Sequence, residues 1–377
     1  MYTSPLRFTD GRFKIMQIAD IQELARVDDD SVKLLRLALE REKPDLAVFT
    51  GDQVYGLHPS FRLGDTRRKL TDALKAILAP LEEAGVPFAV TFGNHDDQCG
   101  VSNAEQADVY AESPLYVGGD FRAAEDRGTY RVPLYGGNGH AFDVYLIDSN
   151  GQESAAGAYL PVKEEQLEWF KAERAKTAAE DGKSVPALVF QHIPVPEYYD
   201  VLKRVPRGTK GAVEAFRAHK NEFYTLPDEI TAAGGFLGES PASPDRNSGE
   251  FDVLKEDGSV LGLLVGHDHA NSFVAEKDGI KLIYTQGCGF HVYGPKRQRG
   301  VRIVTLDESD LSRFDTYTVT FDELTSDRVS EPLNEFVLTH IPTSIEQVKK
   351  WIPLAAAGAA VGGTAAVAVL RRYLRKP

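Results

Sequence analysis

Short apolar runs alternate with longer amphipathic stretches along the N-terminal part of the chain. Each run is bounded by polar or turn-forming residues, which is the pattern of a buried strand. The predicted strands cover residues 13–19, 46–49 and 87–92. Residues 31–41 and 67–84 instead carry apolar side chains at helical spacing, and the acidic run 28–30 suits a helix N-terminus. This alternation predicts parallel βαβ units in an α/β fold.

The same patterns continue less regularly after Asn103. Strands are predicted over residues 130–135, 141–148, 185–190, 259–265, 280–286, 300–306 and 315–321, and a helix over 163–178. Residues 197–250 are rich in Pro, Gly, Ser and charged residues, and an irregular insertion of this length is more often functional than accidental. We therefore predict one domain over 1–321, with the insertion 197–250 as a candidate lid, and a polar linker over 322–350.

The C-terminal stretch 352–370 contains no charged residue and has basic residues on both sides. Its length matches the hydrocarbon core of a bilayer, although its Ala, Gly and Val residues insert more weakly than Leu would. We predict a transmembrane or amphiphilic helix over 351–371 and a basic tail over 372–377. Gly358 and Gly362 are spaced to bring two such helices together in a dimer. The alternative is an Ala-rich helix that packs on the domain or stays flexible.

Two features give opposite orientations for such a membrane segment. More basic residues follow it than precede it, which favours a cytosolic C-terminal end. The first fifteen residues contain no apolar signal core, which favours a cytoplasmic domain held at the membrane by one C-terminal span. We adopt the second interpretation as the expectation.

Composition narrows the classes of partner. The 377 residues carry a formal net charge of -13 at pH 7, which argues against nucleic acid as the main partner. The two cysteines, Cys99 and Cys288, are far apart and indicate neither a disulfide framework nor a metal-binding cysteine pair.

Candidate chemistry lies at the ends of the predicted strands. Five strand ends supply metal-ligand side chains, namely Asp20, Asp52, Asn94 with His95, His192, and His267 with His269. Carboxylate oxygen and imidazole nitrogen suit borderline divalent metals and iron, and alternation places both imidazoles of the last motif on one side. Taken singly, each residue has an ordinary explanation as a turn, a cap or a core histidine. Together they predict two cations sharing Asp52, an arrangement that clamps the attacking and leaving oxygens of a phosphoryl displacement.

The ordered motifs resemble those of the calcineurin-like metallophosphoesterases. The resemblance covers residues 13 to 305 and rests on Asp20, Gly51-Asp52, Gly93-Asn94-His95-Asp96, His192 and Gly266-His267-Asp268-His269. It implies a four-layer αββα sandwich of two mixed β-sheets flanked by helices, with a binuclear metal centre at the sheet edge. The domain 1–321 would then be the catalytic domain.

The resemblance also implies a role for each motif residue. One metal would take Asp20, Asp52 and His269, and the second would take Asp52, Asn94, His192 and His267. A metal-bridging hydroxide would attack the phosphorus of a phosphomonoester, with His95 as general acid or transition-state stabiliser and Asp96 as its catalytic neighbour.

One departure from the family pattern concerns the first metal. Most members have Asp-x-His in the first motif, whereas this chain has Gln22 at the His position. The purple acid phosphatase branch also lacks that His and uses a Tyr from Gly-Asp-x-x-Tyr, which corresponds to Tyr55 here. A Tyr55 phenolate would favour ferric iron, whereas a Gln22 amide oxygen would suit Mn, Zn or ferrous iron. The expected cofactor is therefore Fe with Fe, Mn or Zn.

Further residues are candidates for contacting the phosphorylated substrate. They are Asn94, His95, His291 and Tyr293, with Arg297 and Arg299 as possible phosphate ligands. The main alternative is a phosphodiesterase or nucleotide pyrophosphatase using the same site. A non-catalytic metal-binding scaffold is a third interpretation.

Overall fold

The computed structural model describes residues 2–118, 121–153 and 157–340. A first compact unit ends at Ser330, and a second begins at Glu331 and contains helix α9 (Pro332–His340). The predicted segment 351–371, with Gly358, Gly362 and the basic tail, lies outside the described residues. Within them, no helix is both long enough and apolar enough to cross a membrane.

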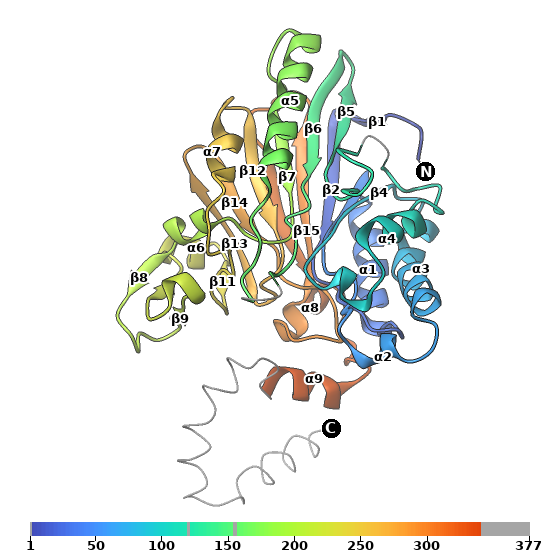
Figure 1. Cartoon of the computed structure of the whole chain (residues 1–377), viewed down its shortest axis with the longest axis vertical. Helices are drawn as coiled ribbons and strands as arrows, with labels where there is room; N and C mark the ends of the chain where they lie inside the picture. Colours follow the sequence, from blue (N-terminus) through green and yellow to red (C-terminus); the bar gives the residue numbers. More distant parts are fainter. Residues whose placement is uncertain (1, 119–120, 154–156, 341–377) are drawn as a thin grey trace, which may run out of the picture. The chain divides into compact units, whose positions relative to one another are not determined.

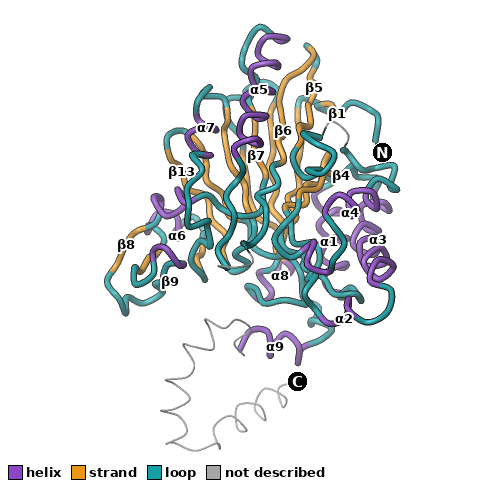
Figure 2. Tube along the Cα trace, in the orientation of Figure 1, coloured by secondary structure: helices purple, strands orange, loops and turns teal. Residues whose placement is uncertain are grey.

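The first unit is built on two mixed sheets, seen side by side in Figures 1 and 2. The five-stranded sheet has the order β16 (Asp315–Thr320), β15 (Gly300–Asp307), β2 (Arg12–Ile18), β3 (Leu46–Thr50) and β4 (Phe88–Thr91). Strands β2, β3 and β4 are parallel, as the alternation of strands and helices predicted. Strand β15 is antiparallel to both of its neighbours, so the sheet is mixed.

The eight-stranded sheet contains the remaining long strands. Its order is β1 (Leu6–Arg7), β5 (Tyr130–Gly136), β6 (Gly139–Leu146), β7 (Ala187–Phe190), β12 (Val260–Val265), β14 (Ile280–Tyr284), β13 (Asn271–Lys277) and β11 (Phe236–Leu237). Strands β6, β7, β12 and β14 are parallel, whereas β5 and β13 pair antiparallel with β6 and β14. Strand β13 was not predicted, because its polar residues obscure the alternation.

Helices cover the outer face of each sheet and complete the four αββα layers. The first set, α1 (Asp29–Glu42), α3 (Thr66–Ala84) and α4 (Asn103–Tyr110), packs on the five-stranded sheet. The second set, α5 (Glu164–Asp181) and α7 (Glu250–Lys255), packs on the eight-stranded sheet. Shorter helical pieces are α2 (Pro59–Arg62), α6 (Asp228–Ala232), α8 (Phe321–Leu324), η1 (Asp96–Cys99), η2 (Pro196–Val201), η3 (Arg217–His219) and η4 (Lys296–Gln298).

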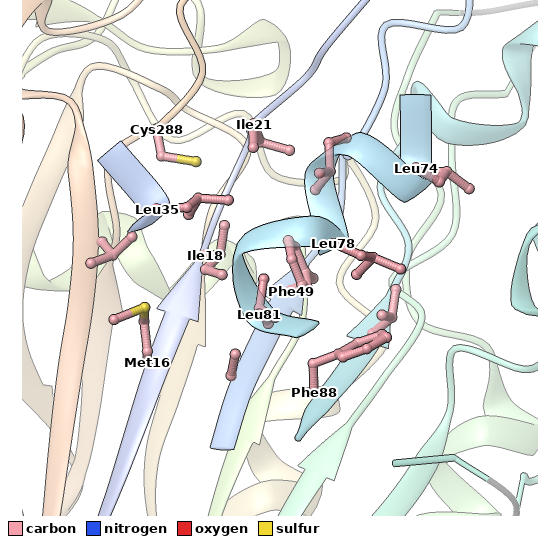
Figure 3. Close-up of a cluster of buried hydrophobic side chains, with 14 of the residues drawn as sticks. Met16, Ile18, Ile21, Leu35, Phe49, Leu74, Leu78, Leu81, Phe88 and Cys288 are labelled. Atoms are coloured by element: carbon pink, nitrogen blue, oxygen red, sulfur yellow. The ribbon is translucent and has the colours of Figure 1, made fainter. Parts of the chain in front are cut away.

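The alternation of side chains along the central strands explains this layering. Met16 and Phe49 point into the cluster under α1 and α3, whereas Ile15 and Val48 point into the cluster between the two sheets. Figure 3 shows the first cluster, in which Leu78 of α3 lies over Phe49 and its buried neighbours. Because these strands are buried on both faces, their ends are held in fixed positions.

The insertion 197–250 is more ordered than its sequence indicated. It contains a three-stranded antiparallel sheet, β8 (Lys203–Val205), β10 (Phe223–Thr225) and β9 (Val213–Glu214), which was not predicted. Near its end, β11 pairs antiparallel with β13 and so joins the main sheet. The insertion is therefore attached to the core at both ends.

Candidate metal centre

The candidate ligands follow the carboxyl ends of parallel strands from both sheets. Asp20 follows β2, Asp52 follows β3, Asn94 follows β4, His192 follows β7, and His267 follows β12. Open α/β sheets form their sites at this edge. Three of the residues have left-handed backbone conformations, with φ of 50° at Asp20, 52° at Asp52 and 75° at His267. Such conformations in non-glycine residues are strained and concentrate at functional sites.

Two glycines allow the ligand loops to approach each other closely. A Cβ atom on Gly93 would collide with Oδ1 and the backbone nitrogen of Asp52. A Cβ atom on Gly266 would lie 2.5 Å from Oδ2 of Asp20. Both positions therefore require glycine because a side chain would collide with a ligand loop, and not because of the backbone dihedral angle.

The donor atoms form two groups that share one carboxylate. Asp20, Asp52 and His269 form the first group, and Asp52, His192 and His267 form the second, with all donors of a group within 4.8 Å of one another. Oδ1 of Asn94 lies 3.2 Å from Nε2 of His192 and extends the second group. These are the residues that the sequence assigned to two cations.

The donor chemistry fits a pair of cations. All five of these carboxylate and imidazole side chains are buried, and Oδ1 of Asp20 has no hydrogen-bond partner among the described residues. A buried carboxylate oxygen without a donor is costly unless something positive binds it. A cation shared between Asp20, Asp52 and His269 would satisfy it.

Backbone carbonyls set which imidazole nitrogen faces the centre. Nδ1 of His192 donates to the carbonyl of Thr50 at 2.9 Å, and Nδ1 of His269 donates to the carbonyl of Tyr293 at 2.9 Å. Each ring therefore presents Nε2 to the carboxylates, with Asp52 at 3.3 Å from His192 and Asp20 at 3.3 Å from His269. A carbonyl behind a metal-binding histidine is the usual way to fix its tautomer.

In the metal-free site, the two carboxylates and the histidines alter each other's charge states. Burial lowers the pKa of His192, but Asp52 and Asp20 outweigh it and raise the pKa to about 10. Burial and the charge of His192 hold the pKa of His267 well below its ordinary value. Burial opposes the ionisation of Asp52, yet His192 and His95 lower its pKa below the usual range. Asp52 therefore stays ionised with His192 as its positive partner, and a bound cation would take the place of the His192 proton.

His95 lies beside the donor groups without belonging to them. Its ring is half-buried, Nδ1 donates to Oε1 of Gln98 at 2.5 Å, and the ring of Tyr55 packs against it edge-on at 5.0 Å. This leaves Nε2 as the atom available to a substrate. Its backbone N–H donates to Oδ1 of Asp52 at 2.8 Å, which joins the His95 loop to the shared carboxylate.

Asp96 lies beneath the site rather than in it. It is fully buried, and its two oxygens accept the backbone N–H groups of four residues, Asp52, Gln53, Val54 and Gly93, at 2.8 to 3.2 Å. These are the turns that carry Asp52 and Asn94. The geometry of Asp96 is that of a support for the ligand loops.

The two candidates for an extra ligand differ in what they contact. Nε2 of Gln22 donates to Oδ2 of Asp52 at 3.0 Å, and Gln22 is buried with φ of 40°. The ring of Tyr55 contacts the rings of His95 and His58, with centroids 5.0 Å and 6.1 Å away. Gln22 therefore touches the shared carboxylate directly.

The other predicted substrate contacts already have partners within the protein. Nδ1 of His291 donates to Glu23 at 2.5 Å, and Tyr293 stacks on His269. Arg299 donates to the carbonyls of Gly289 and Val292, and Arg297 pairs with Asp322. Arg299 therefore holds the backbone of its own loop, and Arg297 holds the start of α8, so these contacts of both arginines are structural.

Sequence reasoning missed several residues around the centre. The ring of Tyr159 packs edge-on against His267 at 4.5 Å, and Phe216 of the insertion stacks on Tyr159 at 5.6 Å. Glu239, also in the insertion, hydrogen bonds to Tyr293. Gln98 was detectable as a hydrogen-bonding residue three positions after His95, whereas the other three carry no local signal.

Comparison with known proteins agrees with this geometry. Residues 13–271 match the family described as calcineurin-like phosphoesterase. The chain is 30% identical over 345 residues to a protein of Arabidopsis thaliana named "Probable inactive purple acid phosphatase 14", with 79% of this chain and 76% of that protein covered. It is 26% identical over 296 residues to "Phosphatase DCR2" of Saccharomyces cerevisiae, covering 71% of this chain and 46% of that protein.

A solved structure shows the same fold. The crystal structure of a dimetal phosphatase from Danio rerio superposes with a TM-score of 0.50 at 17% identity, covering 82% of this chain and 99% of that one. The chain belongs to the calcineurin-like phosphoesterase family, and its αββα fold is the one that this membership implied. Its relatives include three Arabidopsis thaliana proteins named as probable inactive purple acid phosphatases.

Proposed function

We propose that the chain is a dimetal phosphoesterase that hydrolyses phosphomonoesters. The observation that carries the proposal is the convergence of two buried donor groups on Asp52, with the half-buried His95 next to them. Oδ1 of Asp20 supports it, because this buried oxygen makes no hydrogen bond among the described residues and lies 3.3 Å from Nε2 of His269, where a cation could bind both atoms.

Each residue of the candidate site has a defined role in this proposal. Cations held by the two donor groups would supply Lewis acidity toward phosphoryl oxygens and would lower the pKa of a coordinated water. Asp52 orients both groups at once, because its Oδ1 is fixed by the His95 N–H and its Oδ2 by Gln22. Gln98 and Tyr55 hold the His95 ring so that its Nε2 would give a proton to the leaving oxygen or stabilise charge there.

For the first cation we propose Gln22 rather than Tyr55 as the additional ligand. The support is that the Gln22 amide lies at the shared carboxylate, whereas Tyr55 packs against His95. Nε2 of Gln22 makes that contact, so ligation requires the amide to turn its oxygen toward the cation. An amide oxygen with carboxylates and imidazole suits Mn, Zn or ferrous iron. A visible absorption band of the isolated protein that disappears in Tyr55→Phe would contradict this choice and indicate ferric iron on a phenolate.

A non-catalytic metal-binding scaffold is the second candidate. It is favoured by the word "inactive" in the names of three plant relatives. That word applies to those proteins, whereas this chain retains each donor residue and His95. The same site acting on phosphodiesters is the alternative within enzymes.

The test measures metal content and turnover on the same preparations. Protein reconstituted separately with Fe, Mn and Zn is assayed on aryl and alkyl phosphomonoesters and on a matched diester. We expect monoester hydrolysis that Asp52→Asn abolishes and that Asp310→Asn, on the exposed β15–β16 turn, leaves unchanged. Two bound cations with no turnover on either class would support the scaffold, and faster diester cleavage would support the phosphodiesterase.

A further inference from the structure

The end of the insertion is hydrogen bonded to the loop that carries two metal ligands. The Gly238 N–H donates to the carbonyl of Ala270 at 2.9 Å, and the Ala242 N–H donates to Oδ2 of Asp268 at 3.0 Å. In the other direction, the Ala270 N–H donates to Oε1 of Glu239 at 2.9 Å. The loop from His267 to Ala270 is therefore held from outside by the insertion.

Glu239 also reaches a ligand through Tyr293. The hydroxyl of Tyr293 donates to Oε2 of Glu239 at 3.0 Å. The Tyr293 ring lies parallel to the His269 ring, with an interplanar angle of 4° and centroids 4.3 Å apart. The carbonyl of the same Tyr293 accepts the Nδ1 proton of His269 at 2.9 Å. One residue thus fixes both the plane and the tautomer of His269, and Glu239 fixes that residue.

The ligands of the other donor group are supported differently. His192 is held by the carbonyl of Thr50, and the ring of His267 packs against Tyr159. The pair Glu239 and Tyr293 contacts only the histidine of the first group among these three rings, as far as the described contacts go. The bond of Glu239 to the Ala270 N–H also acts next to His269, since Ala270 directly follows it. The effect of the pair is therefore expected at the first cation position.

We propose that Glu239 and Tyr293 are positioning residues that selectively strengthen cation binding by Asp20, Asp52 and His269. The inference rests on the two-cation site of the proposed function, but not on turnover. Groups that orient a ligating histidine typically change metal affinity by about 10- to 100-fold. In this proposal, Glu239 of the insertion 197–250 orients a metal ligand. This role differs from the covering role expected of a lid.

The test is metal binding by the purified full-length chain. Metal-free wild type and the variants Glu239→Ala, Tyr293→Leu and Tyr293→Phe are titrated with Mn²⁺ or Zn²⁺ by calorimetry, and bound metal is counted after dialysis. Tyr224→Phe is the matched control, because it removes a tyrosine–glutamate hydrogen bond, to Glu222, within the same insertion. His269→Ala serves as the benchmark for losing the first cation.

The wild type is expected to bind two cations. Glu239→Ala and Tyr293→Leu should weaken one of the two sites about 10- to 100-fold, as in a partial form of His269→Ala, and leave the other site unchanged. Tyr293→Phe retains the stacked ring and should give an intermediate loss, and Tyr224→Phe should match the wild type. Metal-free circular dichroism spectra establish that each variant is folded.

Three results would overturn the inference. Two sites of wild-type affinity in the folded variants would show that the pair does not support the metal. Equal weakening of both sites would contradict selectivity. If Glu239→Ala fails to fold, an unchanged affinity in Tyr293→Phe decides against the inference. A wild type that binds no cation would refute the proposed function itself. If the wild type binds two cations and the variants bind them equally well, only the present inference fails.

Discussion

Nε2 of His192 lies 3.1 Å from Nδ1 of His267, and the two rings are inclined at 76°. The nitrogens lie just after strands β7 and β12 of one sheet, and they meet the carboxylate of Asp52, which follows β3 of the other sheet. The second donor group therefore contains residues from both sheets. A cation bound by this group would link the two sheets to each other.

This relationship makes metal removal a test of stability. A cation that binds the folded protein and not the unfolded chain stabilises it by about 2.7 kcal/mol at a free concentration 100 times its Kd. We expect chelator-treated protein to melt several degrees below the metal-loaded protein, as measured by calorimetric scans. His192→Ala should lose part of this difference, because it removes one donor from the second group and leaves Asp20, Asp52 and His269 in place.

The control for this prediction is a half-buried histidine outside the candidate metal centre. His219→Ala lies in the insertion and belongs to neither of the two donor groups that share Asp52, so its metal-dependent shift in Tm should equal that of the wild type. An identical Tm with and without metal in the wild type would mean that the donor groups do not bind cations tightly.

Asp96→Asn is expected to destabilise the fold as well as the site. Four backbone N–H groups point at the two oxygens of Asp96, whereas Asn has one oxygen and an amide NH₂ that would face two of those donors. Leaving buried donors unpaired costs about 1–3 kcal/mol, so we expect a loss of about 3 kcal/mol in urea denaturation. The neighbouring exposed carboxylate gives the control, and Asp97→Asn should change stability by less than about 0.5 kcal/mol. If Asp96→Asn kept wild-type stability and lost only turnover, a direct catalytic role would be favoured over support.

His95→Ala should remove catalysis while the metal content stays at the wild-type level. The ring lies outside both donor groups, and positioned proton transfer typically contributes about 10²- to 10⁴-fold to kcat. If His95 protonates the leaving oxygen, the loss should be larger for alkyl than for p-nitrophenyl phosphate, because nitrophenolate leaves without help. Gln98→Ala frees the ring without removing it and should give a smaller loss. Unchanged kcat in His95→Ala would rule out both roles.

The cation ligands were predictable because each one follows a buried strand directly. An apolar run and the polar residue at its end form a local pattern, and parallel strands bring such ends together without further information. Asp20, Asp52 and His192 are therefore found from the sequence. The four-layer fold followed from the family resemblance of the motifs rather than from periodicity, which indicated only βαβ units.

The supporting residues were not predictable because their contacts depend on packing. Glu239 and Tyr293 are far apart in the chain, and the pairing of β11 with β13 brings Glu239 to the loop of the metal ligands. Strand β13 itself has polar residues buried by sheet pairing, so it lacks the expected alternation. Helix α4 was missed although Ser102 and Glu105 form a capping box, a signal that the sequence did contain.

Glu250 should make the stability of the protein fall as pH rises. Its Oε1, Oε1 of Gln191 and Oε2 of Glu197 are buried without a hydrogen-bond partner among the described residues, which a proton on Glu250 would explain. Burial first, and then the charge of Glu197, raise the pKa of Glu250 from 4.5 to about 8. Since the folded state keeps this proton to higher pH than the unfolded chain, stability is full below about pH 4.5, declines up to about pH 8 and is then level. The decline from this group is at most about 5 kcal/mol.

Glu250→Gln tests that dependence, because the amide cannot ionise. Urea denaturation at pH 5, 7 and 9 should show a flatter stability profile for the variant, with its advantage over the wild type largest at pH 9. Glu256→Gln, an exposed glutamate at the other end of α7, is the control and should leave the slope unchanged. If the wild type and Glu250→Gln lost stability in parallel from pH 5 to pH 9, the proton would not reside on Glu250. The unpartnered oxygens would then require another source of positive charge, such as the side chain of Arg246, which lines one pocket together with Gln191 and Glu250.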